Sequence, residues 1–316
     1  MIVHAGTYRL AEPLVFTADD SGTEYRAAGD GEVVISGGSL LDLEWEPCGD
    51  GIARAKTPAG LAFDQLFIYG ARQPMARYPD SGFAADAFDG ERASRWSDPA
   101  GGFIHALHGH RWGGFHYRIT GRKENGELAY EGGWQNNRQM GMHREQRWVE
   151  NIREELDAPG EWFHDPRTGS LYVCPPAGVD LPRATIEVVR LRHLLEFNGT
   201  KQSPVRHVTL RGFVFRHAAR TFMDTREPLL RSDWTVYRGG AVLFNGAEDC
   251  TVADCEFDQL GGNAIFVNNY NRRITIRGCD IHDTGASAVA FVGSAASVRS
   301  PLFEYGQRQS YSQIDR

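Results

Sequence analysis

The chain has 316 residues, 41% of them hydrophobic, and a formal net charge of -7. This acidic balance argues against nucleic acid as the main partner, because phosphate binding needs a basic surface, whereas a polysaccharide remains compatible. The sequence contains no run of about 18 apolar residues, so we expect no membrane-spanning helix and no membrane partner.

Residues 1–81 are expected to form short strands and one hairpin. Four β-prone runs are separated by Gly, Asp and Pro, at residues 2–3, 6–8, 14–16 and 33–35. Residues 64–78 are typical of a hairpin that turns at Tyr69-Gly-Ala. Because the first residues already read as a strand and a turn, we expect no signal peptide in this chain.

Residues 82–178 differ in composition and are expected to form an inserted, β-rich subdomain that ends with a hairpin at 162–173. Five of the seven tryptophans lie here: Trp96, Trp112, Trp134, Trp148 and Trp162. These rings could stack on sugars, but core packing is the favoured interpretation, because aromatic residues dominate small cores.

No metal or cofactor is expected. Four histidines of the subdomain could bind a metal, but no carboxylate or cysteine completes a recognised spacing with His105, His108, His110 and His116. The five cysteines are odd in number and form no paired motif, which argues against a disulfide framework and against a zinc site.

Residues 179–316 contain an internal repeat. Three segments share apolar–Thr–apolar, two turn-like residues and apolar–x–apolar, at residues 208–215, 250–257 and 274–281. A period of 23 or 24 residues that holds short strands and no helix is one turn of a β-solenoid. Cys255 and Cys279 occupy the same position of adjacent turns, which predicts small core residues. The predicted fold class is therefore all-β, a parallel β-helix that carries the inserted β-rich subdomain.

The best candidate acid–base cluster lies on this repeat. Adjacent turns of a solenoid are about 4.8 Å apart, so equivalent outward positions can hold the paired carboxylates that glycoside hydrolysis needs. Asp258 and His282 are equivalent, 24 residues apart, and Asp283 follows. The alternative is that the three are solvated turn residues that cap backbone groups, as Asp commonly does.

Candidate substrate-binding residues lie in two places. A long polar insertion separates the first two repeats, and such a loop on a rigid coil is a common binding site. Asn245 and Asn268 align across turns, and they could form a structural asparagine ladder or bind sugar hydroxyls. The substrate-binding candidates are Arg231, Asp233, Trp234, Asn268, Asn269, Tyr270 and Arg272.

Several blocks of the sequence resemble glycoside hydrolase family 141, a group of bacterial polysaccharide-degrading enzymes. These blocks are residues 5–8, 20–23, 65–74, 149–162, 261–264, 268–273 and 298–305. The resemblance implies a right-handed parallel β-helix with an inserted domain, an oligo- or polysaccharide substrate, and glycosidic cleavage of the fucosidase or xylanase kind. It also implies a secreted or periplasmic location.

Members of the family are about twice as long as this chain. We therefore expect the chain to be an N-terminal portion whose catalytic carboxylates lie in later turns, and to have little or no hydrolase activity by itself. Two alternatives stay open. A polysaccharide lyase would use a Lys, Arg, His or Tyr base, and a non-catalytic carbohydrate-binding adhesin or tailspike would need no carboxylate pair. The sequence does not determine the oligomeric state.

Overall fold

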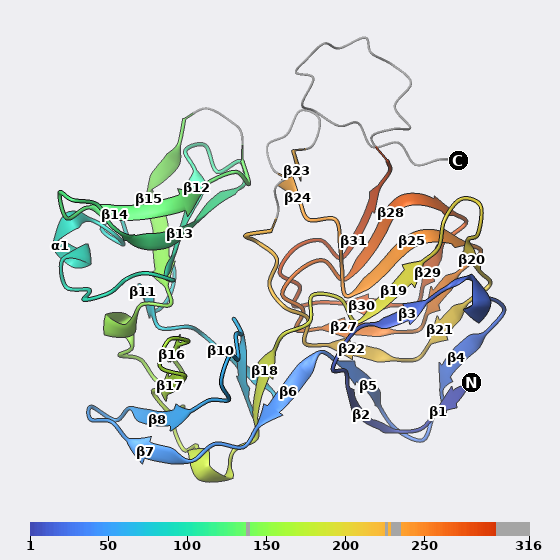
Figure 1. The fold of residues 1–316 in the computed structure, drawn as a ribbon, viewed down its shortest axis with the longest axis horizontal. Coiled ribbons are helices and arrows are strands. Elements are labelled where there is room, and N and C mark those ends of the chain that lie inside the picture. The colour runs from blue at the N-terminus through green and yellow to red at the C-terminus, as the bar shows by residue number, and fades with distance from the viewer. Residues whose placement is uncertain (137–139, 225–226, 229–234, 295–316) are drawn as a thin grey trace. The chain divides into compact units, whose positions relative to one another are not determined.

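The computed structural model describes residues 1–136, 140–224, 227–228 and 235–294 (Figure 1). The chain forms two compact units. The repeat unit comprises Met1–Ser39, Val189–Asp224 and the chain from Tyr237, and the inserted unit comprises Leu40–Val188 and Thr225–Val236. The division at residues 82 and 178 predicted from composition stays a prediction. Among the described residues, no helix is long and apolar enough to cross a membrane.

The repeat unit is built from three parallel sheets. The first contains β1 (Ile2–Val3), β4 (Glu24–Ala27), β21 (Thr209–Arg211), β26 (Thr251–Ala253) and β29 (Thr275–Arg277). The second contains β2 (Gly6–Arg9), β5 (Val33–Ser36), β22 (Val214–Arg216), β27 (Glu256–Asp258) and β30 (Asp280–Ile281). The third contains β3 (Leu14–Phe16), β19 (Leu195–Asn198), β25 (Val242–Glu248), β28 (Ile265–Arg272) and β31 (Val289–Val292), and β20 (Val205–Arg206) also pairs with β25.

The chain visits these sheets in a fixed order, first, second and third, before it returns to the first. Thr209 pairs with Thr251, and Thr251 pairs with Thr275, so the predicted alignment of the three repeats is confirmed. Each strand thus finds its backbone partners in the preceding and following repeats, which is why a 24-residue period specifies parallel pairing. An all-β fold with parallel sheets, as predicted, is what the described residues form.

Identical positions of successive repeats stack in the interior of this unit. The rings of Phe197 and Phe244 stack with centroids 4.2 Å apart, and those of Phe215 and Phe257 stack at 4.8 Å. Cys250 and Cys255 are buried in the same cluster and Cys279 is partly buried against it, so the core position predicted for Cys255 is confirmed. Period-2 alternation places every second side chain of a strand in this column, and the burial of apolar surface there stabilises the unit.

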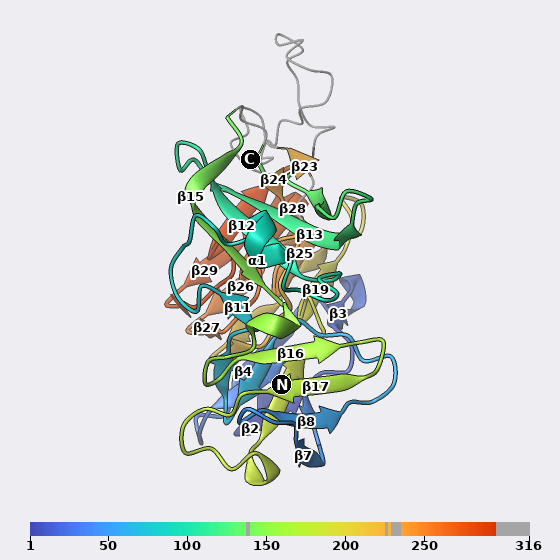
Figure 2. The ribbon, with the colours of Figure 1, turned by 90° about the vertical axis from the view of Figure 1, so that its left-hand side faces the viewer.

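The described residues of the inserted unit form three sheets of four or five strands. One has the order β11 (Arg77–Tyr78), β15 (Met142–Glu150), β12 (Phe103–His108), β13 (Gly114–Arg122) and β14 (Leu128–Gly132). The second has the order β16 (Trp162–Asp165), β17 (Ser170–Val173), β8 (Ala53–Lys56) and β7 (Trp45–Pro47), which can be followed from top to bottom in Figure 2. The third has the order β10 (Ala71–Gln73), β9 (Leu66–Ile68), β18 (Ile186–Val189) and β6 (Gly38–Leu41).

Short elements complete the description. They are α1 (Gly90–Ala93), the 3-10 turns Ala18–Asp20, Arg153–Glu155 and Leu181–Arg183, and the strand pair β23 (Glu227–Pro228) and β24 (Thr235–Val236). Both predicted hairpins are present: β9 pairs antiparallel with β10, and β16 with β17. Tyr69 and Gly70 have φ angles of 51° and 76°, the left-handed geometry that a tight hairpin turn requires.

Candidate functional site

The predicted acid–base cluster lies at the end of the second parallel sheet. Asp258 is the last residue of β27, and His282 follows β30 on the neighbouring strand. The Nδ1 atom of His282 lies 3.5 Å from Asp258 Oδ1 and 3.4 Å from Asp283 Oδ2. One potential ligand atom from each of the three residues lies within 4.8 Å of the other two. The structure therefore brings the three side chains together, and their catalytic role stays a prediction.

Charged neighbours define the character of this cluster. The Asp258 side chain is 8% exposed, and its Oδ2 atom accepts a hydrogen bond of 2.9 Å from Arg216 Nε. The hydrogen bond between His282 and Asp283 raises the pKa of His282. The cluster thus combines a buried carboxylate that pairs with Arg216 and an imidazole that lies between two carboxylates.

A row of asparagines runs across the outer face of the third parallel sheet. Asn198, Asn245 and Asn268 are paired in register on β19, β25 and β28. Asn245 Oδ1 accepts hydrogen bonds from the side-chain amides of Asn268, at 3.5 Å, and of Asn269, at 3.0 Å. The alignment of Asn245 with Asn268 predicted from the repeat is confirmed. We call the outward side of β19, β25 and β28 the ladder face.

A guanidinium group fixes one end of this row. Arg238 donates to Asn268 Oδ1 at 2.7 Å and to the carbonyls of Val292 and Gly293 at 3.3 and 3.1 Å. The amide nitrogen of Asn268 is thereby oriented toward Asn245, because its oxygen is occupied by a cationic donor.

The ladder face also carries a relay of three side chains that the sequence analysis did not identify. Glu196 lies on β19 two residues before Asn198, so the two side chains share a face. His193 Nδ1 lies 2.7 Å from Glu196 Oε1, and Tyr237 Oη lies 2.8 Å from His193 Nε2. A carboxylate only accepts, so Nδ1 carries the imidazole proton and Nε2 accepts from the phenol.

Burial keeps the phenol of Tyr237 in this relay neutral. The side chains of His193 and Glu196 are 16% and 27% exposed. Burial raises the pKa of Tyr237, so the phenol is neutral and donates in the neutral pH range. A carboxylate that is hydrogen-bonded to an imidazole stabilises a positive charge that forms on the ring, and Glu196 is in this position beside His193.

A glycine makes room for the relay. A Cβ atom on Gly239 would overlap His193 Nε2 and would lie 2.6 Å from Tyr237 Cε1. Asn263 Nδ2 donates to the carbonyls of Tyr237 and Gly239 at 3.2 and 2.8 Å, which fixes the backbone on this side. The sequence held one signal, a His that lies three residues before a Glu. Tyr237 lies 44 residues away in the chain, so only the fold reveals the third member.

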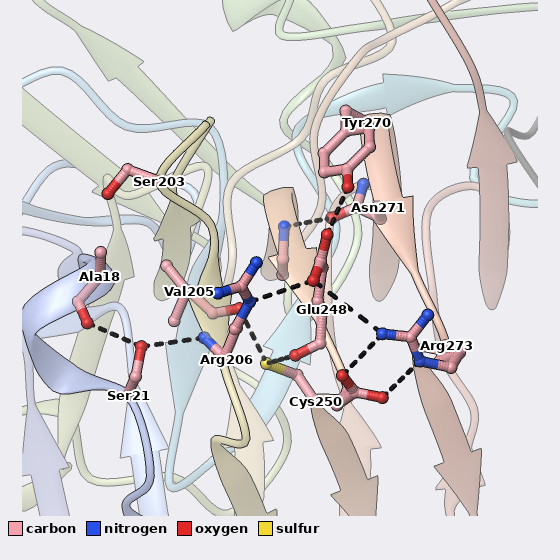
Figure 3. A network of polar contacts seen from close by, with 12 residues as sticks. Ala18, Ser21, Ser203, Val205, Arg206, Glu248, Cys250, Tyr270, Asn271 and Arg273 are labelled. Carbon is pink, nitrogen blue, oxygen red and sulfur yellow. Dashed lines mark hydrogen bonds and ion pairs between the residues drawn. The ribbon is translucent and has the colours of Figure 1, made fainter. Parts of the chain in front are cut away.

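The remaining predicted residues lie farther along the third sheet, at the end of β28. Tyr270 donates a hydrogen bond from its hydroxyl to Glu248, and the guanidinium of Arg272 lies over the Tyr270 ring, 5.5 Å from its centroid. Figure 3 shows Glu248 between Arg206 and Arg273, with Tyr270 directed toward it. These contacts place Tyr270 and Arg272 in a charged cluster at the corner where the third sheet leads into the first.

The two groups of predicted residues are not in one place. β27 ends at Asp258, and β28 begins only at Ile265 and runs on to Arg272. At about 3.3 Å per residue, Tyr270 lies roughly 16 Å beyond the start of β28. The acid–base cluster and the Tyr270 corner are therefore at opposite ends of the strands of the third sheet. The predicted loop residues Arg231, Asp233 and Trp234 lie outside the described residues.

The four histidines considered above as possible metal ligands belong to two clusters. His105 Nδ1 lies 2.7 Å from His116 Nδ1, and His105 Nε2 lies 3.1 Å from Glu150 Oε1. His108 and His110 instead stack on Trp112. Buried aromatic rings such as Trp96 and Trp162 belong to the cores of this unit, which agrees with the favoured interpretation, while Trp112 is 53% exposed.

The comparisons with known proteins find likeness in structure alone. No protein-family model matches the chain, and no curated protein matches it. A solved structure named "Glycoside hydrolase" is similar, with a TM-score of 0.72 and 20% identity over 88% of this chain and 57% of that one. For "The complex structure of XylC with xylose" the TM-score is 0.48 and the identity 13%, over 92% of this chain and 45% of that one. The chain thus spans about half the length of these structures. Its fold is similar to that of the structure named "Glycoside hydrolase".

Proposed function

We propose that the three parallel sheets are the faces of a right-handed parallel β-helix and that the protein is a carbohydrate-active enzyme, most closely a glycoside hydrolase related to family 141. The proposed substrate is a plant or microbial polysaccharide, cleaved with fucosidase- or xylanase-like chemistry. Support comes from the internal repeat, from the sequence blocks that resemble family 141, and from the likeness in fold to a solved structure named "Glycoside hydrolase". A secreted or periplasmic location belongs to the same proposal.

The observation that carries the proposal is the combination of groups on the ladder face. Asn198, Asn245 and Asn268 supply amides along one row. The side chain of Glu196 lies on the same face one row away and is joined to His193 and Tyr237. Amides suit sugar hydroxyls because each can both donate and accept, and a carboxylate–imidazole–phenol relay suits proton transfer.

Each member of the relay has a defined part in this proposal. Tyr237 takes a proton from a group on the substrate or from water while its own proton passes to His193 Nε2. Glu196 then stabilises the imidazolium that forms. Asp258, His282 and Asp283 are retained as an alternative acid–base centre at the other end of the strands.

Binding and turnover test the proposal separately. We expect the chain to bind xylo-oligosaccharides or fucosylated oligosaccharides in titration calorimetry, and Asn268→Ala to weaken that binding about tenfold or less, as the loss of a neutral hydrogen bond implies. The matched control is Asn125→Ala, in an exposed turn of the inserted unit. Absence of binding to every neutral and charged glycan in a broad panel contradicts the proposal.

Variants then separate the two acid–base centres. Glu196→Gln and Asp258→Asn are compared for release of reducing ends by the chain and by any longer product of its gene. The relay is the working centre if Glu196→Gln removes turnover by two orders of magnitude or more and Asp258→Asn does not. The converse result assigns catalysis to the Asp258 cluster.

A second function, that of a polysaccharide lyase, is favoured by one observation. A phenol hydrogen-bonded to an imidazole is a suitable base for removing a proton next to a carboxylate, and the ladder face presents such a pair in Tyr237 and His193. A lyase leaves an unsaturated sugar that absorbs near 235 nm, whereas a hydrolase adds water and does not. The absorbance of the product therefore decides between the two reactions.

A further inference from the structure

Four cationic side chains gather at the corner beyond the ladder face. We call Lys201, Arg206, Arg272 and Arg273 the basic corner. Arg206 on β20 pairs in register with Glu248 on β25, and Glu248 pairs with Arg272 on β28. Because neighbouring strands are about 4.8 Å apart, Arg206 and Arg272 lie roughly 10 Å from each other along the stacking direction. The repeat therefore builds a row of charges across adjacent strands.

Two carboxylates lie within this corner, and both are occupied. Glu248 accepts from Arg206 Nε at 3.0 Å and from the Tyr270 hydroxyl, and Asp249 accepts from Arg273 at 2.5 and 2.8 Å (Figure 3). The hydrogen bond from Tyr270 and the nearby guanidiniums lower the pKa of Glu248, and Arg273 lowers the pKa of Asp249. Both are therefore ionised near neutral pH.

The cations outnumber these carboxylates. Four positive side chains stand against the two carboxylates that pair with them, in a chain whose formal net charge is -7. Among the described residues, no carboxylate lies within ion-pairing distance of Lys201 or Arg272. Lys201 is exposed and Arg272 is half-buried, so both charges are available at the surface for an anion.

Both of these cations lie close to one aromatic ring. Lys201 Nζ is 5.8 Å and the Arg272 guanidinium is 5.5 Å from the centroid of the Tyr270 ring. The Tyr270 hydroxyl is held by Glu248, which fixes the orientation of the ring. An aromatic face contacts the C–H surface of a sugar, and Arg and Lys pair with carboxylate or sulfate. Asn269 precedes Tyr270 in the chain and is exposed, and its amide donates to Asn245 at 3.0 Å.

We propose that the basic corner binds an anionic saccharide, one whose rings bear carboxylate or sulfate groups, with the sugar against Tyr270 and the anion between Lys201 and Arg272. This deepens the proposed function and rests on it, because it assumes a carbohydrate ligand. It names the class of that carbohydrate: a form of the proposed substrate whose sugars carry uronic acid or sulfate groups, bound more tightly than the neutral form. The rest of the acidic chain repels such a polymer, which confines its attraction to this corner.

The test compares ligands that differ only in charge. Oligogalacturonate and its fully methyl-esterified form have the same sugar and linkage, and calorimetry at 50 mM salt measures the affinity of the whole chain for each. A sulfated and an unsulfated dextran fragment form the second pair and distinguish sulfate from carboxylate. We expect the charged member of one pair to bind at least tenfold more tightly, and the difference to shrink at 500 mM salt.

Variants locate the site. Arg272→Gln and Lys201→Gln each lower the affinity for the charged ligand about five- to tenfold, while affinity for its neutral partner is unchanged. The matched control is Arg277→Gln, which removes an exposed arginine of β29 outside the corner and leaves the affinity unchanged. Circular dichroism verifies that each variant is folded.

The outcomes are distinct. Equal affinity for charged and neutral ligands, or full affinity in Arg272→Gln, overturns the anionic site and leaves the proposed carbohydrate function intact. Failure to bind any of the four saccharides, charged or neutral, counts against both. Equally tight binding of inorganic polyphosphate or single-stranded DNA shows a general attraction for polyanions, and it overturns the assignment to a saccharide.

Discussion

The hydroxyl oxygen of Tyr237 lies 2.8 Å from Nε2 of His193, and the opposite ring nitrogen of that histidine lies 2.7 Å from Glu196. The first of these hydrogen bonds joins segments that are 44 residues apart in the chain, whereas His193 and Glu196 are three residues apart. Because the carboxylate orients the imidazole, the phenol meets a fixed acceptor. The relay therefore stabilises the ladder face whether or not it also transfers protons.

Removal of the phenol hydroxyl tests that stabilising role. Tyr237→Phe leaves the partly buried Nε2 of His193 without its donor, and we expect the repeat unit to lose about 1–2 kcal/mol of unfolding free energy. The measurement is urea unfolding followed by far-ultraviolet circular dichroism. Tyr8→Phe is the matched control, because its hydroxyl donates to the His4 carbonyl in an exposed setting, and it should cost less than about 0.5 kcal/mol. Equal effects of the two variants would contradict the prediction.

A methyl group at Gly239 should disrupt the same relay by overlap. In Gly239→Ala the new Cβ atom meets the imidazole of His193 and the ring of Tyr237. We expect a destabilisation of about 1–3 kcal/mol, the usual cost of overpacking, measured in the same urea experiment. Gly90→Ala is the control, since nothing lies within 4 Å of a Cβ there. A crystal structure of Gly239→Ala with the relay unchanged would refute the steric argument.

The inserted unit should become less stable as the pH rises from about 5 to 8. Glu161 is 1% exposed, and burial raises its pKa to about 7 from an ordinary value of 4.5. The folded state thus holds the proton more tightly than the unfolded state, so stability is full below about pH 4.5 and falls as pH rises through 7. The loss reaches about 3 kcal/mol at most. Tryptophan fluorescence reports on this unit, because the six tryptophans among the described residues all belong to it.

A variant isolates this effect. Glu161→Gln cannot ionise and should show a flatter dependence of stability on pH, although it is less stable overall. Both carboxylate oxygens of Glu161 accept from backbone N–H groups of Arg77, Asp157 and Ala158, and an amide nitrogen cannot accept. Glu91→Gln, on the exposed surface of α1, should retain the slope of the wild type. An unchanged slope in Glu161→Gln assigns the dependence to another group.

The cysteines should differ sharply in reactivity toward a thiol reagent at pH 8. Cys48 is exposed and should react within minutes, whereas Cys250 and Cys255 are buried in the repeat core. Burial also raises the pKa of Cys255 to about 11, so its reactive thiolate is scarce. Mass spectrometry of labelled peptides follows each site. Modification of Cys255 as fast as Cys48 in folded protein would show that the repeat core opens readily.

The internal repeat could be recognised in the sequence alone, and with it the pairing of strands and several core positions. Thr251 and Thr275 lie one period apart and pair in register, since local alternation and a constant period leave each strand one set of equivalent partners. The same reasoning placed Cys255 in the core and Asp258 beside His282. Both hairpins followed from local turn chemistry, which acts over a few residues and can be recognised in a linear sequence.

The hydrogen bonds between polar side chains of distant segments could be found only in the folded structure. Tyr237 reaches His193 from 44 residues away, and no period or spacing in the chain relates the two. The folded structure also separates Asp258 from Tyr270, because the eight-residue strand β28 carries the chain from one corner of the repeat unit to the next. A repeat fixes the partners of each backbone strand, whereas side chains that leave the repeat are positioned by contacts between distant segments. The relay of Tyr237, His193 and Glu196 depends on such contacts.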